Sequence, residues 1–207
     1  MSPLLKNFKT AYVEAQNLLP FLDDYTNPRD FLARLVKKGD LLRLKNGFFL
    51  IREKIQEDPA PFEQIANLLY GPSYISLEWA LSYYGMIPEG VYVVTSVTVN
   101  QSKRFSPPIG AFDYRYLNHS RYAVGIDQQE NSAGRYLIAR PEKALADVVH
   151  FKAKTLNKKD LLIDLIEGRR IEEETLKTLD KKMMREIAEQ SHSQAVHELV
   201  KALDLLS

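Results

Sequence analysis

The chain has 207 residues, enough to bury a sizeable hydrophobic core as one large domain or two small ones. Its formal net charge is only +1, which excludes a strongly basic or acidic protein. The charge is uneven, however: residues 1–54 hold ten Lys and Arg against six Asp and Glu, a local charge of +4. The N-terminal part is therefore the region whose charge best suits nucleic acid, although small domains with this charge also occur without such a partner.

The cellular location follows from what the sequence lacks. There is no cysteine, so disulfide bonds, thiolate nucleophiles and cysteine metal sites are excluded. The first residues do not form the long apolar segment of a signal peptide. No apolar run reaches the ~20 residues that a membrane-spanning helix needs. We therefore expect a cytoplasmic protein.

The N-terminal region predicts two helices and a hairpin. Apolar residues recur at helical spacing over most of residues 3–19, and Pro20 ends this first helix. Asn27 is a good N-cap for a second helix, which two lysines and a glycine end at residues 37–39. Two strands follow, and the Asn-Gly pair at residues 46–47 predicts a type I′ turn between them. Helix, glycine, strand, turn and strand in this order predict the second half of a winged helix-turn-helix.

The outward face of the second predicted helix carries the candidate DNA-binding side chains. Arginine and lysine at such positions contact bases and phosphates in a major groove. In the hairpin, Lys45 and Asn46 would lie at the wing tip and contact the DNA backbone or the minor groove. The alternative is a solvated helix face with an ordinary Asp30–Arg34 pair, and a charged hairpin tip that only discourages edge pairing. The candidates are Arg29, Arg34, Lys37, Lys38, Arg43, Lys45 and Asn46.

A polar segment with two prolines, residues 55–61, predicts a domain boundary, so the expected domains are 1–56 and 57–207. Residues 62–151 then show helical and strand-like patterns, and the rest of the chain has helical spacing to its end. The fold class is α+β: a winged helix-turn-helix, then an antiparallel sheet flanked by helices with a helical C-terminal bundle. The predicted elements are helices at 62–70, 76–84 and 141–151, and strands at 91–99, 112–117, 122–126 and 135–139.

Three stretches together resemble one family, the AbiEi-type antitoxins. The pattern LARLVKKGDLLRLKNGFFLI (32–51) resembles their winged-helix domain. The segment GPSYISLEWALSYYGMIPEGVYVVTSVT (71–98) is similar to the start of their second domain, and IARPEKALADVV (138–149) resembles a later stretch of it. Taken together, these stretches cover the order of most of residues 27–149, whereas the C-terminal helices carry no familiar pattern.

The resemblance implies a transcriptional regulator of a type IV toxin–antitoxin system. Such a protein represses its own operon by binding operator DNA through the winged helix. Its second domain is associated with antitoxicity, and a nucleotidyltransferase-like toxin is encoded nearby. The family has no accepted catalytic residues, so the resemblance implies no enzyme activity, cofactor or metal.

Other readings of the sequence remain open. The chain could be a protein-interaction module whose winged helix binds a partner protein rather than DNA. A remote alternative is a metal-dependent nuclease that uses Asp113, Asp147 and His150, with Glu142 nearby. No phosphate-binding loop, nucleophile elbow or zinc helix supports it. The aromatic residues Tyr74, Trp79, Tyr83 and Tyr84 could stack on bases, but their helical spacing favours a place in the core.

Overall fold

Two β-sheets organise the chain in the computed structural model, which describes residues 3–22, 26–119, 122–153 and 156–206. The first sheet is antiparallel in the order β1-β3-β2 and holds β1 (Tyr12–Glu14), β2 (Leu41–Lys45) and β3 (Phe48–Ile51). The second has the order β6-β7-β5-β4-β9-β8 and holds β4 (Ser73–Ile75), β5 (Val94–Thr98), β6 (Lys103–Phe105), β7 (Phe112–Tyr116), β8 (Ile126–Asn131) and β9 (Gly134–Ala139). The α+β class is confirmed.

The second sheet is mixed, so the prediction of an antiparallel sheet was wrong. β5 runs parallel to β7, and β4 runs parallel to β9. Both parallel pairs join strands that are distant in the sequence, and parallel pairing depends on such crossover connections rather than on local turns. The sequence pattern also missed β4 and β6, which are only three residues long. The strand predicted at 122–126 begins later in the chain, as β8 (Ile126–Asn131).

The prediction of one helix over residues 3–19 was wrong. The chain forms a short 3-10 helix, η1 (Pro3–Asn7), then β1, then α1 (Ala15–Leu18) and a second 3-10 helix, η2 (Leu19–Leu22). Pairing with β3 replaces the helical hydrogen bonds, since the Ile51 amide donates to the Ala11 carbonyl at 2.8 Å. Val13 of this strand is buried in the core. Long-range pairing therefore overrides a helical pattern that local spacing alone favours.

The second predicted helix is confirmed as α2 (Pro28–Lys38). The side chain of Asn27 accepts a hydrogen bond from the Asp30 amide, and Pro28 occupies the first turn. Gly39 ends the helix in the left-handed conformation with φ 83°, and its amide donates to carbonyls of the last turn. Start and stop signals are local, so the sequence alone located this helix.

The turn between β2 and β3 is not type I′. Gly47 has the expected positive φ of 74°, but Asn46 is absent from the described non-glycine residues with positive φ, and a type I′ turn needs both. A register shift between Arg43 and Lys45 adjusts the hairpin instead.

Gly47→Val should destabilise the protein by about 1–3 kcal/mol, because a β-branched residue at this φ is strained. Among the described atoms, an added Cβ would lie within 4 Å of Ala15 Cβ alone, at 3.8 Å. The loss of stability therefore comes from backbone strain rather than from a steric clash. Asn46→Ala, at the exposed neighbouring position, is the matched control and should change stability by less than about 0.5 kcal/mol. Thermal and urea unfolding would measure both. Equal stability of Gly47→Val and the wild type would contradict this turn geometry.

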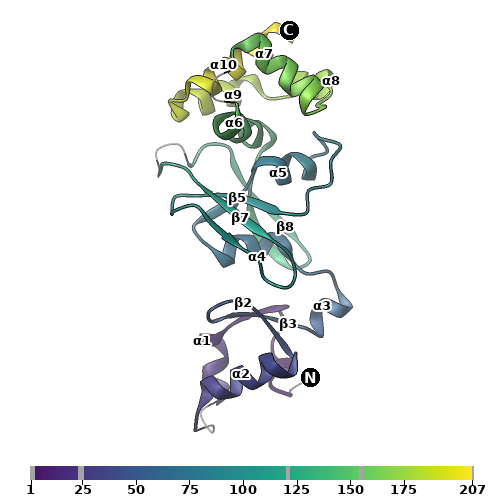
Figure 1. The fold of residues 1–207 in the computed structure, drawn as a ribbon, viewed down its shortest axis with the longest axis vertical. Helices are drawn as coiled ribbons and strands as arrows, with labels where there is room; N and C mark the ends of the chain where they lie inside the picture. The colour runs from purple at the N-terminus through teal and green to yellow at the C-terminus, as the bar shows by residue number, and fades with distance from the viewer. Residues whose placement is uncertain (1–2, 23–25, 120–121, 154–155, 207) are drawn as a thin grey trace.

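Strand β3 joins the two lobes of the molecule because both of its faces are buried. Phe49 and Ile51 pack in the N-terminal core with Leu32 and Leu35 of α2. Phe48 and Leu50 face the other way into the larger core of the second lobe. Accordingly, the hairpin lies between α2 and α4 (Phe62–Leu69) in Figure 1. The continuous run of four apolar residues in β3 is the sequence signature of this two-sided burial.

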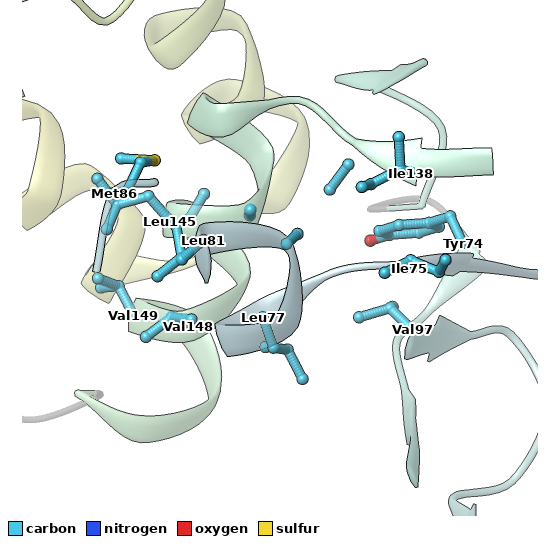
Figure 2. Close-up of a cluster of buried hydrophobic side chains, with 14 of the residues drawn as sticks. Tyr74, Ile75, Leu77, Leu81, Met86, Val97, Ile138, Leu145, Val148 and Val149 are labelled. Atoms are coloured by element: carbon cyan, nitrogen blue, oxygen red, sulfur yellow. The ribbon is translucent and has the colours of Figure 1, made fainter. Parts of the chain in front are cut away.

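Helices cover the second sheet and continue to the C-terminus. Figure 2 shows Leu77 and Leu81 of α5 between the sheet residues Tyr74, Val97 and Ile138 on one side and Leu145 and Val149 of α6 on the other. The C-terminal helices stack on α6 at the end of the molecule farthest from α2 (Figure 1). The helical elements are α3 (Lys54–Glu57), α4, α5 (Leu77–Tyr83), α6 (Pro141–Lys152), α7 (Lys158–Ile163), the π-helical turn η4 (Asp164–Gly168), α8 (Glu173–Lys177), α9 (Lys181–Ser191), α10 (Gln194–Leu203) and η5 (Asp204–Leu206).

The predicted helices of the second lobe are close to those observed, and the helical C-terminal region is confirmed. One local detail differs. Ser76 does not cap α5, because its hydroxyl donates to the buried Asp147 carboxylate at 2.7 Å instead. Within the described residues, no helix has the length and apolarity that crossing a membrane requires.

Candidate nucleic-acid interface

The outward face of α2 gathers positive charge at one end of the molecule. Leu32 and Leu35 point into the N-terminal core, while the polar side chains of the helix lie in solvent. The helix has 11 residues and is therefore about 16 Å long, comparable with the ~12 Å width of a B-DNA major groove. In Figure 1, α2 lies at the opposite end from the C-terminal helices. Its exposed basic side chains are Arg29, Arg34, Lys37 and Lys38.

These cations are not neutralised by neighbouring acids within the described ranges. The Asp30–Arg34 pair that the alternative reading expects does not form, because the Asp30 carboxylate accepts from Asn27 Nδ2 at 2.7 Å. The Arg34 guanidinium lies 5.8 Å from the centroid of the Phe31 ring instead. A cation over an aromatic face keeps its full charge and loses only part of its hydration. Among the described residues, the α2 face therefore carries four cations that form no ion pair, beside the single exposed carboxylate of Asp30.

The hairpin contributes less to this face than the sequence predicts. Arg43 is exposed, with its guanidinium 6.0 Å from the Phe49 ring, and Asn46 is exposed in the turn. Lys45 points elsewhere: its ammonium donates to the carbonyl oxygens of Leu69 at 2.7 Å and Leu68 at 3.2 Å. Those carbonyls end α4, where cations are stabilised by the helix dipole. Lys45 therefore connects the two lobes, and its ammonium is engaged there rather than at the wing tip.

A residue that the site prediction omitted, Arg52, supports α2 directly. Its Nε donates to the Gly39 carbonyl at 2.7 Å, immediately after the last turn of the helix. The bond between Arg52 and Gly39 thus holds the end of α2 beside the residue that follows β3. A basic residue directly after an apolar strand was the only sequence signal for this role, and that pattern is common on exposed loops.

The aromatic residues divide between the core and the surface. Tyr74 is fully buried, as expected of a core residue. Burial, followed by the nearby Asp147 carboxylate, raises the pKa of Tyr74, so its hydroxyl remains a donor. Trp79 and Tyr83 stack at 5.7 Å with their planes 16° apart, and Tyr83 is 46% exposed. The expectation that all four residues belong to the core was therefore wrong for Tyr83.

The acidic residues considered for a nuclease are held apart in other interactions. Asp147 forms an ion pair with Lys143 at 2.8 Å and accepts from the hydroxyls of Tyr74 and Ser76. Asp113 pairs with Arg115 at 3.0 Å near the surface. Across the residues that the structure describes, no three His, Asp or Glu side chains are grouped closely enough to hold a metal ion.

The sequence analysis did not foresee the Lys143–Asp147 network. Lys143 and Asp147 are four residues apart on α6, and both side chains are only 3% exposed. The available signal was their position on the same face of α6 as buried apolar residues, since a charged pair at such spacing usually faces solvent. The burial of this face becomes evident only when the C-terminal helices are packed on α6.

Comparisons with known proteins show a distant structural likeness. No protein-family model and no curated protein sequence matches the chain. The crystal structure of the Rv2827c protein from Mycobacterium tuberculosis is similar, with a TM-score of 0.46 and 13% sequence identity. The match covers 98% of this chain and 77% of that one. A similarity of this degree assigns neither a family nor a function.

Proposed function

We propose that this protein is a DNA-binding transcriptional repressor and the antitoxin of a type IV toxin–antitoxin system. Residues 1–56 form its winged helix-turn-helix domain, and residues 57–207 form the second domain. It acts in the cytoplasm by occupying the operator of its own operon, without catalysis and without a cofactor. A nucleotidyltransferase-like toxin encoded nearby is the second expected partner.

The observation that carries this proposal is the exposed basic face of α2, whose four cations form no ion pair with the described residues. A helix-turn-helix protein reads DNA with a helix whose inner face packs on the domain core and whose outer side chains enter the major groove. Arg34 and Lys37 lie on such an outer face, with Arg29 and Lys38 beside them. The order of η1, β1, α1 with η2, α2, β2 and β3 also suits a winged helix, as does the strand order β1-β3-β2.

The sequence resemblance supplies the more specific part of the proposal. It covers α2 and the hairpin, the region around β4 and α5, and the first half of α6. The role as an antitoxin rests on this resemblance alone. The DNA-binding role also rests on the exposure and charge of α2, so the two parts can be tested separately.

Arg34→Ala should weaken binding to a duplex from the upstream region by about 1–3 kcal/mol and weaken binding to scrambled DNA much less. A lost base contact removes specific affinity, whereas a lost phosphate contact weakens all sequences and reduces the salt dependence. Fluorescence anisotropy titrations at several salt concentrations would measure both effects. The matched control is the double variant Lys181→Ala and Lys182→Ala on α9, which should weaken both DNAs equally or neither.

The reverse result would favour the protein-interaction module. In that case Arg34→Ala would leave operator affinity and its salt dependence unchanged, while the Lys181 and Lys182 variant abolished binding. Residues 27–51 would then be the surface for a protein partner.

A further inference from the structure

A cleft of about 960 Å³ opens between the two lobes and belongs to neither the α2 face nor the Lys143–Asp147 network. Lys9, Tyr12 and Lys54 line it from the N-terminal lobe, and Phe62, Trp79 and Tyr92 line it from the second lobe. Small-molecule sites have volumes of roughly 300–1,000 Å³ and occur preferentially at domain interfaces. The cleft therefore has the size and position of a ligand site.

The second-lobe wall offers flat aromatic surfaces. Trp79 is held in place on one side by its stack on Tyr83, and its amide donates to Thr95 Oγ1 at 3.2 Å. Tyr92 is 93% exposed, an unusual position for a tyrosine on a folded surface. A planar ring bound beside Trp79 and Tyr92 would remove this aromatic surface from water, and such stacking accepts any heteroaromatic base.

The other wall supplies charges of both signs. Lys54 Nζ donates to the backbone carbonyl of Lys9 at 3.3 Å, and both lysines line the cleft. Within the described part of the chain, neither ammonium group forms an ion pair, so both are available to an anion. Asp58 and Glu63 line the same cleft and offer carboxylate acceptors. A ligand that suits the cleft needs an anionic group for the lysines and hydroxyl donors for the carboxylates.

We propose that the interlobe cleft binds a mononucleotide. The base stacks beside Trp79 and Tyr92, the ribose hydroxyls donate to Asp58 and Glu63, and the phosphate contacts Lys9 and Lys54. Each part of this ligand finds its chemical complement in the cleft: π surface for the base, acceptors for hydroxyls and cations for phosphate. This binding site is separate from the α2 face and does not depend on the proposed DNA binding.

Tryptophan fluorescence measures occupancy of the cleft directly, because Trp79 is the only tryptophan in the sequence. Titration of the full chain with adenosine monophosphate should change the tryptophan emission saturably, with half-saturation below about 1 mM. Adenosine and inorganic phosphate should each bind at least roughly tenfold more weakly, because each lacks one of the two strongest contacts. A protein without a nucleotide site would show no saturable change with any of the three, and that result would overturn the proposal.

Variants on the two walls separate base recognition from phosphate recognition. Lys9→Ala with Lys54→Ala should weaken adenosine monophosphate binding about tenfold and leave adenosine unaffected, whereas the control pair Lys181→Ala and Lys182→Ala should change neither. Tyr92→Ala should weaken both ligands about fivefold, and Tyr116→Ala on β7 should not. Lys54 is partly buried and the other substituted side chains are exposed, and none of them belongs to the buried core, so the variants should fold. Unchanged nucleotide affinity in the lysine pair would place the ligand elsewhere and refute this assignment.

Discussion

Replacing Asp147 with alanine should lower the free energy of unfolding by about 3–5 kcal/mol, the cost of removing one member of a buried ion pair. The carboxylate lies 2.8 Å from the Lys143 ammonium, and both side chains are nearly inaccessible to solvent. It also accepts from the hydroxyls of Tyr74 at 2.9 Å and Ser76 at 2.7 Å. The substitution therefore leaves a buried cation without this carboxylate and two buried hydroxyls without their acceptor.

Two further variants distinguish this account from a general loss of negative charge. Asp113→Ala removes a carboxylate whose partner, Arg115, is half exposed, and it should cost less than about 1 kcal/mol. The double variant Lys143→Met with Asp147→Leu replaces both charges by apolar groups and should recover much of the stability. Urea unfolding would measure all three. Similar losses for Asp147→Ala and Asp113→Ala would contradict the buried network.

Gly125→Ala should destabilise the protein by about 2–4 kcal/mol for two reasons that add. Gly125 has φ 82°, and an L-residue there is strained. An added Cβ would also lie 2.7 Å from Lys143 Cβ and 3.1 Å from Ile187 Cδ1. Lys143 Cβ is fixed by the backbone of α6, so this contact can be relieved only by moving the helix or the loop.

The glycine at position 85 provides the matched control. Gly85 has φ 67°, but among the described residues no heavy atom lies within 4 Å of the Cβ that a substitution would add. Gly85→Ala therefore carries the conformational cost without the clash and should lose only about 1–2 kcal/mol. Chemical denaturation of the two variants isolates the steric part as their difference. Equal losses would show that the loop at Gly125 does not approach α6 as closely as described.

The sequence predicted those elements whose signals are local. α2 was located by Asn27, Pro28 and Gly39, and each of these residues acts within one turn of the helix. α6 was similarly located by Pro141 and its apolar spacing. The exposed basic residues of α2 were assigned to the outward face because helical periodicity alone determines which side chains oppose Leu32 and Leu35.

Features that depend on distant partners were not predictable in the same way. β1 exists because β3, almost 40 residues later, supplies its hydrogen bonds. Lys45 was assigned to a wing tip by its place in a hairpin, yet the end of α4 determines where its ammonium lies. The cleft residues come from six separated parts of the chain, and no spacing in the sequence brings Lys9 and Trp79 together. Tertiary packing decides all three features.

We propose that α2 lies in the major groove of operator DNA, and directed cleavage tests this placement most directly. The chain has no cysteine, so Ala33→Cys places a unique thiol on the exposed face of α2 for an iron chelate that cleaves nearby DNA. Gln190→Cys on α9, also exposed, is the matched control. The account predicts cleavage at a discrete position of the upstream duplex from residue 33 and none from residue 190. Bound duplex that is left intact by the conjugate at residue 33 but cleaved by the conjugate at residue 190 would contradict it.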